Sequence, residues 1–381
     1  MKKPKFLFLL IILIPFLFSS CTKKDDPVSP SEKQFPSQTV TALDQGLQEA
    51  LQEYDAPGII VGVWSPEGSY VRAVGTSNLV TGEPMRINNH FRMGSVTKLF
   101  TGTVTLMLVD SGKINLDSSL AYYLPQYSFP KADKITVRML GNMVSGIFDY
   151  SEHPEYLSNG FATQWSHPFT IDSLVKISLQ YPLNFEPGTQ WAYSNTNTEL
   201  LGLICEKVTG KTIRELITNM ILIPYGLTNT FWPLNGYFAL PYSHGYTNYI
   251  PDGKGLRDAT NYNPSYAGAA GCMTTDIYDL KKFLKLLIDG SFYSPAMQAV
   301  RLTSVPGLSQ IYGFNLAKLL GGNMLGHTGG IWGFNTIAFR IPSKDMTIVI
   351  SSNYFWNDGF PPAEGVMLKV VPIVAPELFA K

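Results

Sequence analysis

Apolar residues recur first at helical and then at strand spacing where the folded part of the chain begins. Between Val40 and Tyr54 the apolar positions lie three or four residues apart, which predicts an amphipathic helix. Two strand-like runs follow at 58–64 and 70–74, with a Pro-Glu-Gly turn at 66–68 between them. This pattern predicts a β-hairpin directly after the helix.

Helical patterns dominate the middle of the chain, and strand patterns return near its C-terminus. Helices are predicted at 102–111, 170–180, 197–209, 212–222 and 275–287, with Gly210 as the C-cap of the third. Strands are predicted at 311–319, 323–326, 333–341 and 345–352, and a last helix begins near Ala363. The stretch 225–266 is rich in Tyr, Asn, Pro and Gly, and long irregular stretches of this kind often form the walls of a substrate site.

Strands at both ends of the chain, with helices between them, predict the fold class. The simplest single sheet joins the two ends antiparallel and carries an inserted, mainly helical subdomain, which makes the fold α+β rather than alternating parallel βαβ. On this division the folded domain covers 39–381. Its α/β part lies at about 39–105 and 270–381, and its helical part at about 106–269.

Composition narrows the classes of function. The chain has 381 residues, of which 45% are hydrophobic and 15% charged, enough for one large domain or two closely packed ones. Lys+Arg and Asp+Glu are both 29, so no general field attracts nucleic acid, and no nucleic-acid partner is expected. The five histidines form no close pair with metal-ligand spacing, so a zinc site is not expected either.

The first 38 residues are typical of an exported protein. Lysines at 2, 3 and 5 precede an apolar run at 6–18 that is too short to span a bilayer, and Ser19, Ser20 and Cys21 follow. This layout predicts a signal peptide at 1–20. The sequence Phe-Ser-Ser-Cys resembles a bacterial lipobox, which implies that Cys21 is lipidated, and residues 21–38 read as a polar tether in which no packing is expected.

The predicted location is therefore the bacterial cell envelope, with the chain anchored to a membrane by its N-terminal lipid. The sequence Cys-Thr-Lys-Lys-Asp-Asp resembles the surface-export tag of some Bacteroidetes lipoproteins, so either the periplasmic or the surface side of the outer membrane fits. The alternative is a signal peptide cut beside an irrelevant cysteine. Of the two later cysteines, Cys205 lies in an apolar helical stretch, where a free thiol behaves as a small hydrophobe, so a disulfide with Cys272 is not favoured.

A serine and a lysine stand three residues apart in the stretch F-R-M-G-S-V-T-K-L-F, residues 91–100, at the head of an apolar run. On a helix, Ser95 and Lys98 share a face. If the helix starts near Gly94, Ser95 lies in its first turn, where free N–H groups and the helix dipole favour a developing negative charge. Ser-x-x-Lys occurs four times in the chain, and the other three copies lack this context. The alternative interpretation is a plain helix N-cap.

A second constellation, F-E-P-G-T-Q-W-A-Y-S-N-T-N, occupies residues 185–197. In an extended loop, residues two apart point the same way, so Tyr193 and Asn195 are candidates to face one site. The alternatives are a packed aromatic for Tyr193 and a helix N-cap for Asn195. A second Tyr-x-Asn, at 246–248, shows that the spacing also arises by chance.

A third constellation, Gly326-His327-Thr328-Gly329-Gly330, lies between two strand-like runs. Its paired glycines at 329 and 330 would leave room for a substrate against the strand edge. His327 taken alone is more often a structural histidine than a ligand.

Taken together and in this order, the three constellations resemble the serine β-lactamase and penicillin-binding protein superfamily. The branch that fits contains class C β-lactamases, D-alanyl-D-alanine carboxypeptidases, D-aminopeptidases and related esterases. The resemblance covers about 40–380 and includes F-R-M-G-S-V-T-K, L-G-N-M-V-S-G-I, F-E-P-G-T-Q-W-A-Y-S-N and G-H-T-G-G-I-W-G-F. It departs from the family at 142–144, where His-Thr-Ser-Gly is usual, at His327 in place of a lysine, and at Trp332, where proline is common.

The resemblance implies a β-lactamase/transpeptidase-like fold and a role for each motif residue. Ser95 is then the nucleophile, with Lys98 and Tyr193 as its proton-transfer partners, and either neutral lysine or tyrosinate is the base. The backbone N–H groups of Ser95 and Gly330 form the oxyanion hole. The implied substrate-binding residues are Asn195, His327, Thr328, Gly329 and Gly330.

We therefore expect an exported serine hydrolase that cleaves an amide or ester through an acyl-enzyme, with no cofactor or metal and no protein partner. The leading substrates are a small D-amino-acid peptide or a carboxylic ester. A β-lactam is less favoured because a lysine that would pair with its carboxylate is absent. The alternative is a penicillin-binding or peptidoglycan-sensing lipoprotein that is acylated and does not turn over. An aromatic rim of Tyr150, Trp191, Trp232 and Trp332 is expected around the site.

Overall fold

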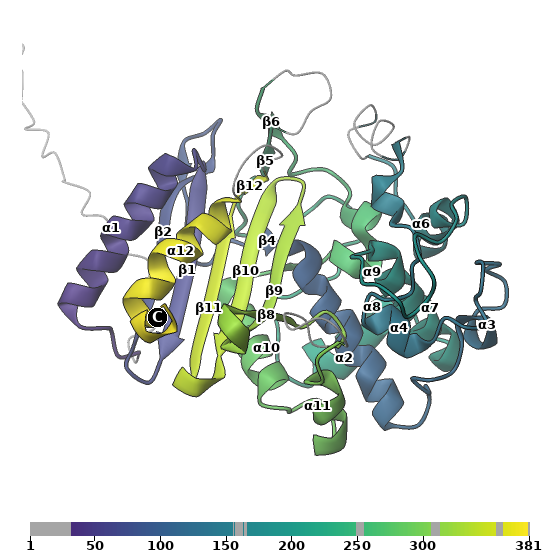
Figure 1. Ribbon diagram of the computed structural model, residues 1–381. Coiled ribbons are helices and arrows are strands. Elements are labelled where there is room, and N and C mark those ends of the chain that lie inside the picture. The colour runs from purple at the N-terminus through teal and green to yellow at the C-terminus, as the bar shows by residue number, and fades with distance from the viewer. Residues whose placement is uncertain are drawn as a thin grey trace, which may run out of the picture.

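The computed structural model of the chain describes residues 32–154, 156, 163, 166–248, 255–305, 313–355 and 361–379 (Figure 1). The predicted signal peptide at 1–20, Cys21 and most of the predicted tether lie outside these residues. Among the described residues, no helix combines the length and the apolar character that crossing a bilayer requires.

A seven-stranded antiparallel sheet, built from both ends of the chain, forms the centre of the α/β part (Figure 1). Its strands, in the order β3-β2-β1-β11-β10-β9-β8, are β3 (Glu83–Pro84), β2 (Gly68–Asn78), β1 (Gly58–Ser65), β11 (Met346–Ser352), β10 (Phe334–Ile341), β9 (Met324–Ile331) and β8 (Ala317–Leu319). The two ends of the chain meet where β1 pairs with β11, with Val61 opposite Ile350. The predicted α+β fold class is therefore confirmed.

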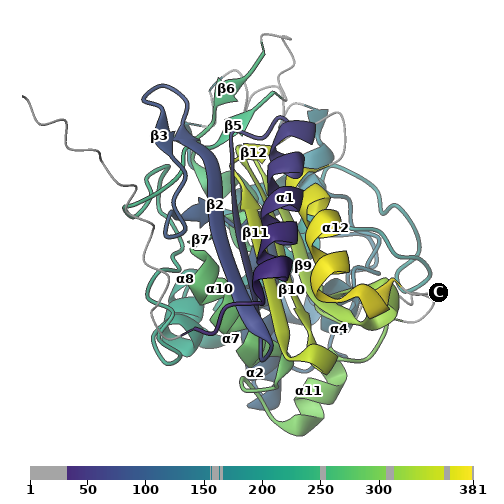
Figure 2. The ribbon, with the colours of Figure 1, turned by 90° about the vertical axis from the view of Figure 1, so that its left-hand side faces the viewer.

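Two helices cover one face of the sheet, as Figure 2 shows: α1 (Ser37–Glu53), near the N-terminus, and α12 (Pro362–Val374), near the C-terminus. Leu43 and Leu47 of α1 are buried against this face, as the helical spacing in the sequence predicts. Val366 and Val370 of α12 join the same apolar cluster. The two chain ends thus share one core.

The other face packs against α10 (Ile277–Ile288) and against the turn η1 (Gly94–Val96), which leads into α2 (Thr97–Asp110), with the helical part beyond α2 (Figure 1). The remaining helices are α3 (Leu120–Tyr123), α4 (Val137–Gly141), α6 (Ile171–Ser178), α7 (Asn195–Thr209), α8 (Ile213–Ile217), α9 (Gly268–Gly271) and α11 (Pro295–Arg301). Because α2 lies between the sheet and the helical part, apolar residues surround it on all sides, and even Lys98 and Thr101 are buried. The motif helix is therefore the centre of the larger core.

Short elements complete the fold. Two small sheets join β4 (Phe91–Arg92) to β7 (Thr274–Thr275), and β12 (Tyr354–Phe355) to β5 (Tyr246–Thr247) and β6 (Arg257–Asp258). Single turns form η1 (Gly94–Val96), η2 (Tyr150–Glu152), η4 (Pro264–Ala267), η5 (Leu320–Gly322), η6 (Pro342–Lys344) and η7 (Pro376–Leu378), and the π-helical turn η3 (Thr218–Leu222) continues α8.

Two predicted strands differ from the structure. The described part of 311–319 is strand only in β8, because Phe314 and Asn315 take positive φ angles of 55° and 63°, which extended strands do not allow. The run predicted at 323–326 extends to Ile331, so the Gly-His-Thr-Gly-Gly motif lies within β9 rather than in a loop.

The end of the predicted tether packs on the domain. Gln34 forms a bridge with Ser69 of β2, and Phe35 is buried in the core under α1. Glu32 accepts hydrogen bonds from the Trp64 indole at 3.1 Å and from Lys281 at 2.8 Å. The expectation that no packing occurs before residue 38 is wrong for these residues, because Phe35 supplies apolar surface that a polar linker lacks.

Candidate active site

Ser95 lies in η1, the single turn that leads into α2, as the motif predicts. The turn is held from two sides. The N–H of Met93 donates to the carbonyl of Met273 at 3.0 Å, and Gly94, with φ +54°, packs against the backbone of β9. A Cβ atom on Gly94 would lie 2.8 Å from the nitrogen of Gly330, so only glycine fits this approach.

Lys98 reaches Ser95 from the next turn of the helix. Its buried Nζ lies 3.0 Å from Ser95 Oγ, 2.7 Å from Asn195 Oδ1 and 2.8 Å from the carbonyl oxygen of Ala270. The last two atoms accept hydrogen bonds and cannot donate. A neutral amine has two N–H groups and one lone pair, so with both N–H groups on these acceptors its lone pair faces the Ser95 hydroxyl.

Asp149 fixes the orientation of the Asn195 amide. The Nδ2 of Asn195 donates to Asp149 Oδ2 at 3.0 Å, and the Asn195 backbone N–H donates to the same oxygen at 3.0 Å. Because a carboxylate accepts only, the amide oxygen of Asn195 must face Lys98. Asn195 begins α7 and Ser194 is the N-cap, so the N-cap interpretation of Asn195 does not hold.

Tyr193 approaches Ser95 from the other side. Its hydroxyl donates to Ser95 Oγ at 2.8 Å, and the Lys98 amine lies 4.8 Å from the centre of its ring. Tyr193 and Asn195 therefore face the same pair, as their spacing predicts.

Burial sets the protonation states of the two candidate bases. Desolvation lowers the pKa of Lys98 to about 7, against the nearby carboxyls of Asp149 and Glu199, which raise it. Desolvation also raises the pKa of Tyr193 well above 10, and the hydrogen bond to Ser95 opposes this only in part. Of the two bases that the sequence leaves open, tyrosinate is therefore disfavoured, because burial dominates the pKa of Tyr193. Neutral Lys98 is the more accessible base.

Strand β9 runs beside this group, and its Gly330 contacts Gly94, the residue before Ser95. A Cβ atom on Gly329 would lie 2.0 Å from the carbonyl oxygen of Met93, so this glycine is needed for the approach of β9 to η1. Gly326 is similarly close to the backbone of β10. Thr328 lies opposite Ile337 and is half-buried. Room for a substrate is therefore not the reason for Gly329.

His327 is buried in β9 and its Nδ1 is hydrogen-bonded to the carbonyl of Thr328. Desolvation, together with the neighbouring Lys98, lowers its pKa to about 4, well below the ordinary histidine value near 6.5. His327 is neutral at all working pH values and supplies no cation to the site.

A cavity of about 150 Å³ opens over Ser95. Its lining includes Ser95, Ser151, Asn195, Ala267, Ala270, Gly271, Gly330 and Ile331, with the aromatic side chains Tyr150, Tyr156, Tyr266, Trp332 and Phe355. Trp332 stacks edge to face on Phe355, with ring centres 5.0 Å apart. His327, Thr328 and Gly329 do not reach this lining, nor does any lysine or arginine.

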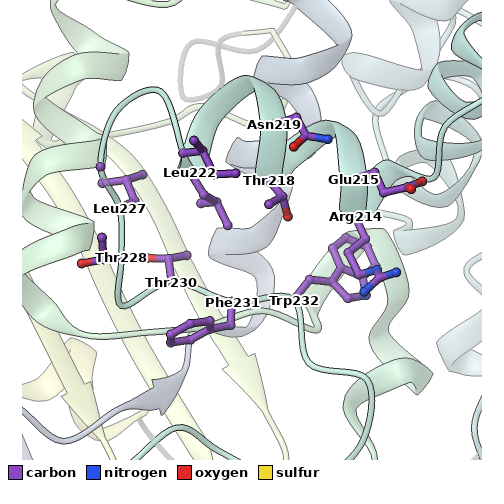
Figure 3. A pocket seen from close by; sticks show the side chains of 12 residues that line it. Arg214, Glu215, Thr218, Asn219, Leu222, Leu227, Thr228, Thr230, Phe231 and Trp232 are labelled. Atoms are coloured by element: carbon purple, nitrogen blue, oxygen red, sulfur yellow. The ribbon is translucent and has the colours of Figure 1, made fainter.

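A second, larger cavity of about 590 Å³ lies between α8, η3 and the loop at 226–232 (Figure 3). Trp232 belongs to this cavity and not to the one over Ser95, so its predicted place in the rim is wrong. Trp191 is half-buried and also lies outside the lining over Ser95, whereas Tyr150 and Trp332 are in it. The larger cavity has no serine, and its one carboxyl, Glu215, caps α8, so the chemistry lies with the smaller cavity.

Three residues that hold the site were not found from the sequence. Asp149 orients Asn195, Ala270 accepts a hydrogen bond from Lys98, and the buried Glu199 binds the backbone beside Ala270. The signal available for Glu199 was a carboxyl four residues after Asn195, directly before the apolar stretch that begins at Leu200.

The segment at 142–144, where the chain departs from the family, retains a polar support. Ser145 donates to Asn197 Oδ1 at 2.5 Å, and Asn197 Nδ2 contacts the sulfur of Met143 at 3.2 Å. Met143 is buried with a positive φ of 58°. Its thioether thus takes one of the hydrogen bonds of Asn197.

Other candidate chemistry is absent from the described ranges. Within them, no three His, Cys, Asp or Glu side chains gather closely enough to hold a metal ion. Cys205 and Cys272 are both buried and free, and burial raises the pKa of both thiols.

Comparison with known proteins identifies the group to which this arrangement belongs. A family model described as Beta-lactamase matches residues 43–367. The chain belongs to the β-lactamase family. Like the family, it is a serine hydrolase, and the geometry around Ser95 fits that chemistry.

Individual relatives of this β-lactamase-family chain include binding proteins and amidases. Penicillin-binding protein 4* of Bacillus subtilis is 26% identical over 331 residues, which span 81% of this chain and 71% of the relative. A D-stereospecific amidohydrolase from Streptomyces sp. is 30% identical with a TM-score of 0.77, over 87% of this chain and 97% of that one. D-amino acid amidase from Ochrobactrum anthropi SV3, complexed with L-phenylalanine amide, is 25% identical with a TM-score of 0.77, over 90% and 99% of the two chains.

Proposed function

We propose that this chain is an exported serine hydrolase that cleaves an amide or ester through an acyl-enzyme on Ser95, with neutral Lys98 as the base. The observation that carries the proposal is the set of three partners around Lys98 Nζ. Two of them only accept hydrogen bonds, and burial lowers the lysine pKa to about 7, so a lone pair is available to Ser95 near neutral pH.

Acylation begins when the Ser95 hydroxyl proton passes to Lys98 Nζ while Oγ forms a bond to the substrate carbonyl carbon. The carbonyl electrons move onto oxygen, and the backbone N–H groups of Ser95 and Gly330 stabilise that oxyanion. Both residues line the cavity, which supports this assignment. When the tetrahedral intermediate collapses, the bond to the leaving group breaks, and the leaving group takes a proton from Tyr193. The lysine ammonium restores the proton of Tyr193.

Deacylation repeats these steps with water. The base takes a proton from water as its oxygen adds to the acyl carbon, and Ser95 Oγ then leaves with a proton returned from the same pair. The carboxylic acid product and the resting enzyme result. Every proton is accounted for by Ser95, Lys98 and Tyr193, so no further group is required for proton balance.

The preferred substrate carries an apolar, preferably aromatic acyl group and no carboxylate next to the bond that is cleaved. Aromatic side chains form much of the cavity lining, and none of the described lysines or arginines belongs to it. Neutral His327 cannot replace the missing cation. Amides and esters of small D-amino acids fit this description better than β-lactams, and the related D-stereospecific amidohydrolase and D-amino acid amidase are named for such substrates.

The location of the protein is part of the proposal. The charged, apolar and small-residue layout at 1–20, with Cys21 after it, supports export and lipidation. The lipidated chain would be held at the outer membrane, on its periplasmic or surface side.

Turnover distinguishes the hydrolase from a sensor that is acylated and stops. Short-chain p-nitrophenyl esters, D-phenylalanine p-nitroanilide and a chromogenic cephalosporin are compared with the purified chain. Continuous release of product supports the proposal, whereas a burst equal to the enzyme concentration followed by no steady rate supports the sensor. Ser95→Ala is expected to abolish both turnover and labelling by a fluorophosphonate, and activity retained by Ser95→Ala would overturn the assignment of the nucleophile.

A further inference from the structure

A buried carboxyl stands behind the lysine and takes no part in the steps above. Glu199 lies on α7, one turn after Asn195, and its side chain is fully buried. Its Oε2 accepts a hydrogen bond from the N–H of Ala269 at 2.8 Å, and its Oε1 accepts one from the N–H of Ala270 at 3.2 Å. These N–H groups belong to the first turn of α9, where the backbone has no intrahelical acceptor for them.

The same short turn holds Lys98. The carbonyl oxygen of Ala270 accepts a hydrogen bond from Lys98 Nζ at 2.8 Å. Ala270 therefore binds Glu199 through its N–H group and Lys98 through its carbonyl group. Because Asn195 and Glu199 are four residues apart on α7, they share a face of the helix. Asn195 contacts Lys98 directly, and Glu199 reaches it through α9.

The surrounding backbone is shaped around this carboxyl. Gly268 has a φ of +39°, and a Cβ atom on it would lie 2.4 Å from Glu199 Oε2. The Tyr150 hydroxyl lies 3.4 Å from Glu199 Oε1 and 3.1 Å from the carbonyl of Tyr266. Gly268 therefore has to be a glycine, because a larger residue would collide with the Glu199 carboxyl. Tyr150, which also lines the substrate cavity, contacts the same carboxyl.

We propose that Glu199 is a positioning residue for acylation, which holds the Ala269–Ala270 backbone so that the Ala270 carbonyl directs the lone pair of Lys98 at Ser95. The proposal rests on the role of Lys98 as base given above. Without Glu199, α9 loses the acceptor for two of its N–H groups, and the Ala270 carbonyl is free to turn away from Lys98. The lysine then keeps one directing acceptor, Asn195, instead of two.

The protonation state of Glu199 bears on the pH dependence. Its carboxyl faces Lys98 on α2, Tyr150 on η2, Tyr156, and Cys272 after α9. Burial raises the pKa of Glu199 to about 8, against its two backbone donors, so the carboxyl is mostly protonated at the pH values where Lys98, with a pKa of about 7, titrates. Replacing it with a neutral amide therefore leaves the charge around Lys98 nearly unchanged, and the acid limb of activity keeps its midpoint.

The test is Glu199→Gln, which keeps the shape of the side chain and can accept only one of the two backbone hydrogen bonds. With a neutral p-nitrophenyl ester, the acylation rate is expected to fall on the order of 10- to 100-fold, as for a small displacement of a reacting group. The midpoint of the acid limb of kcat/KM is expected to stay at its wild-type value, so the loss shows as a lower plateau, whereas a general loosening that lets water reach Lys98 would raise the midpoint. Gly268→Ala displaces the carboxyl from the other side and is expected to lower the rate in the same way.

Glu206→Gln is the matched control, because Glu206 lies on the same helix and accepts a backbone hydrogen bond from Ile213 at 2.9 Å, away from Lys98. It is expected to leave both the rate and the acid limb unchanged. A folded Glu199→Gln with a wild-type rate would overturn the proposal. A rate loss no larger than the loss of folded protein seen in thermal melts would overturn it too, as would a loss accompanied by a raised midpoint of the acid limb. If Glu199→Gln does not fold, Gly268→Ala decides by the same criteria.

These outcomes are separate from failure of the proposed function. If Ser95→Ala retains activity, the nucleophile is wrong and the Glu199 result has no bearing. If Ser95→Ala is inactive and Glu199→Gln behaves as wild type, the positioning role of Glu199 is wrong and the proposed function stands.

Discussion

Gly94 and Gly330 are in direct backbone contact: a Cβ atom on Gly94 would lie 2.8 Å from both the nitrogen and the carbonyl oxygen of Gly330. The two residues belong to η1 and to β9, which are far apart in the sequence. Their contact joins the turn that carries Ser95 to the strand that is proposed to supply the second N–H of the oxyanion hole. The separation of these two N–H groups is therefore set by how closely two glycines approach.

Gly94→Ala is expected to lose most of the acylation rate and to lower stability. A non-glycine residue at φ +54° costs roughly 1–2 kcal/mol, and the contact with Gly330 adds about 1–3 kcal/mol of overpacking. Gly82→Ala is the control, because Gly82 has φ +71° and nothing within 4 Å of its Cβ position. The measurement is the unfolding free energy in urea together with the labelling rate of Ser95. Equal losses in both variants would show that only the backbone angle matters.

The pH profile of kcat/KM for a neutral ester reports the titration of Lys98. The base must be unprotonated, and its pKa is lowered to about 7, so activity is expected to fall about tenfold per unit below that pH and to level off above it. Lys98→Met should remove this limb and cost on the order of 10² to 10⁴ in rate. Tyr193→Phe should cost a similar factor, with less than additive loss in the double variant because the two act as a unit. An acid limb with its midpoint near pH 10 would show that the pKa of Lys98 is that of an ordinary lysine, and would contradict its role as a neutral base.

Neutral His327 is expected to leave substrate preference independent of pH. With its pKa lowered to about 4, the ratio of kcat/KM for an anionic cephalosporin to that for a neutral ester should stay constant between about pH 5.5 and 9. A ratio that falls as pH passes 6.5 would show a histidine that titrates against the substrate carboxylate. His327→Lys should raise this ratio at pH 8 if the new side chain reaches that carboxylate as an ammonium. The expected factor corresponds to roughly 1 to 3 kcal/mol of binding free energy.

Trp332 and Trp232 provide a matched pair for substrate specificity, because each lines a different cavity. Trp332→Ala should raise KM for p-nitrophenyl phenylacetate about 3- to 10-fold, the value of a lost aromatic contact. KM for p-nitrophenyl acetate should change little, because its acyl group is too short to reach the aromatic lining. Trp232→Ala should leave both substrates unchanged. A parallel rise in KM for the acetate would argue against an aryl-binding cavity.

Cys21→Ala is expected to move the protein from the membrane fraction to the soluble fraction. Its activity on a soluble ester should not change, because Cys21 precedes Glu32, which already packs on the domain through Trp64 and Lys281. The measurements are fractionation of cells that express each form and specific activity of the two fractions. If the variant stays in the membrane fraction, Cys21 is not the membrane anchor and the prediction of lipidation is wrong.

The sequence alone predicted the local features of the site. Ser95 and Lys98 share a helix face because their spacing is that of one helical turn, and the spacing of Tyr193 and Asn195 predicted that both face the same pair. The order of elements predicted a sheet built from both chain ends, since strand patterns occur only there. The shared faces follow from neighbours within a few residues along the chain, and the sheet follows from the order of the strand and helix patterns.

Only the tertiary structure decided what depends on groups far apart in the sequence. The pKa values of Lys98, Tyr193 and His327 are set by desolvation inside the packed core, and no residue pattern reports how deeply a side chain is buried. The positions of Asp149 and Glu199 behind Lys98 arise where α7, η2 and α9 meet. The sequence therefore determined which residues are candidates for the chemistry, and the packing of distant elements determined which of them is placed to hold the proton.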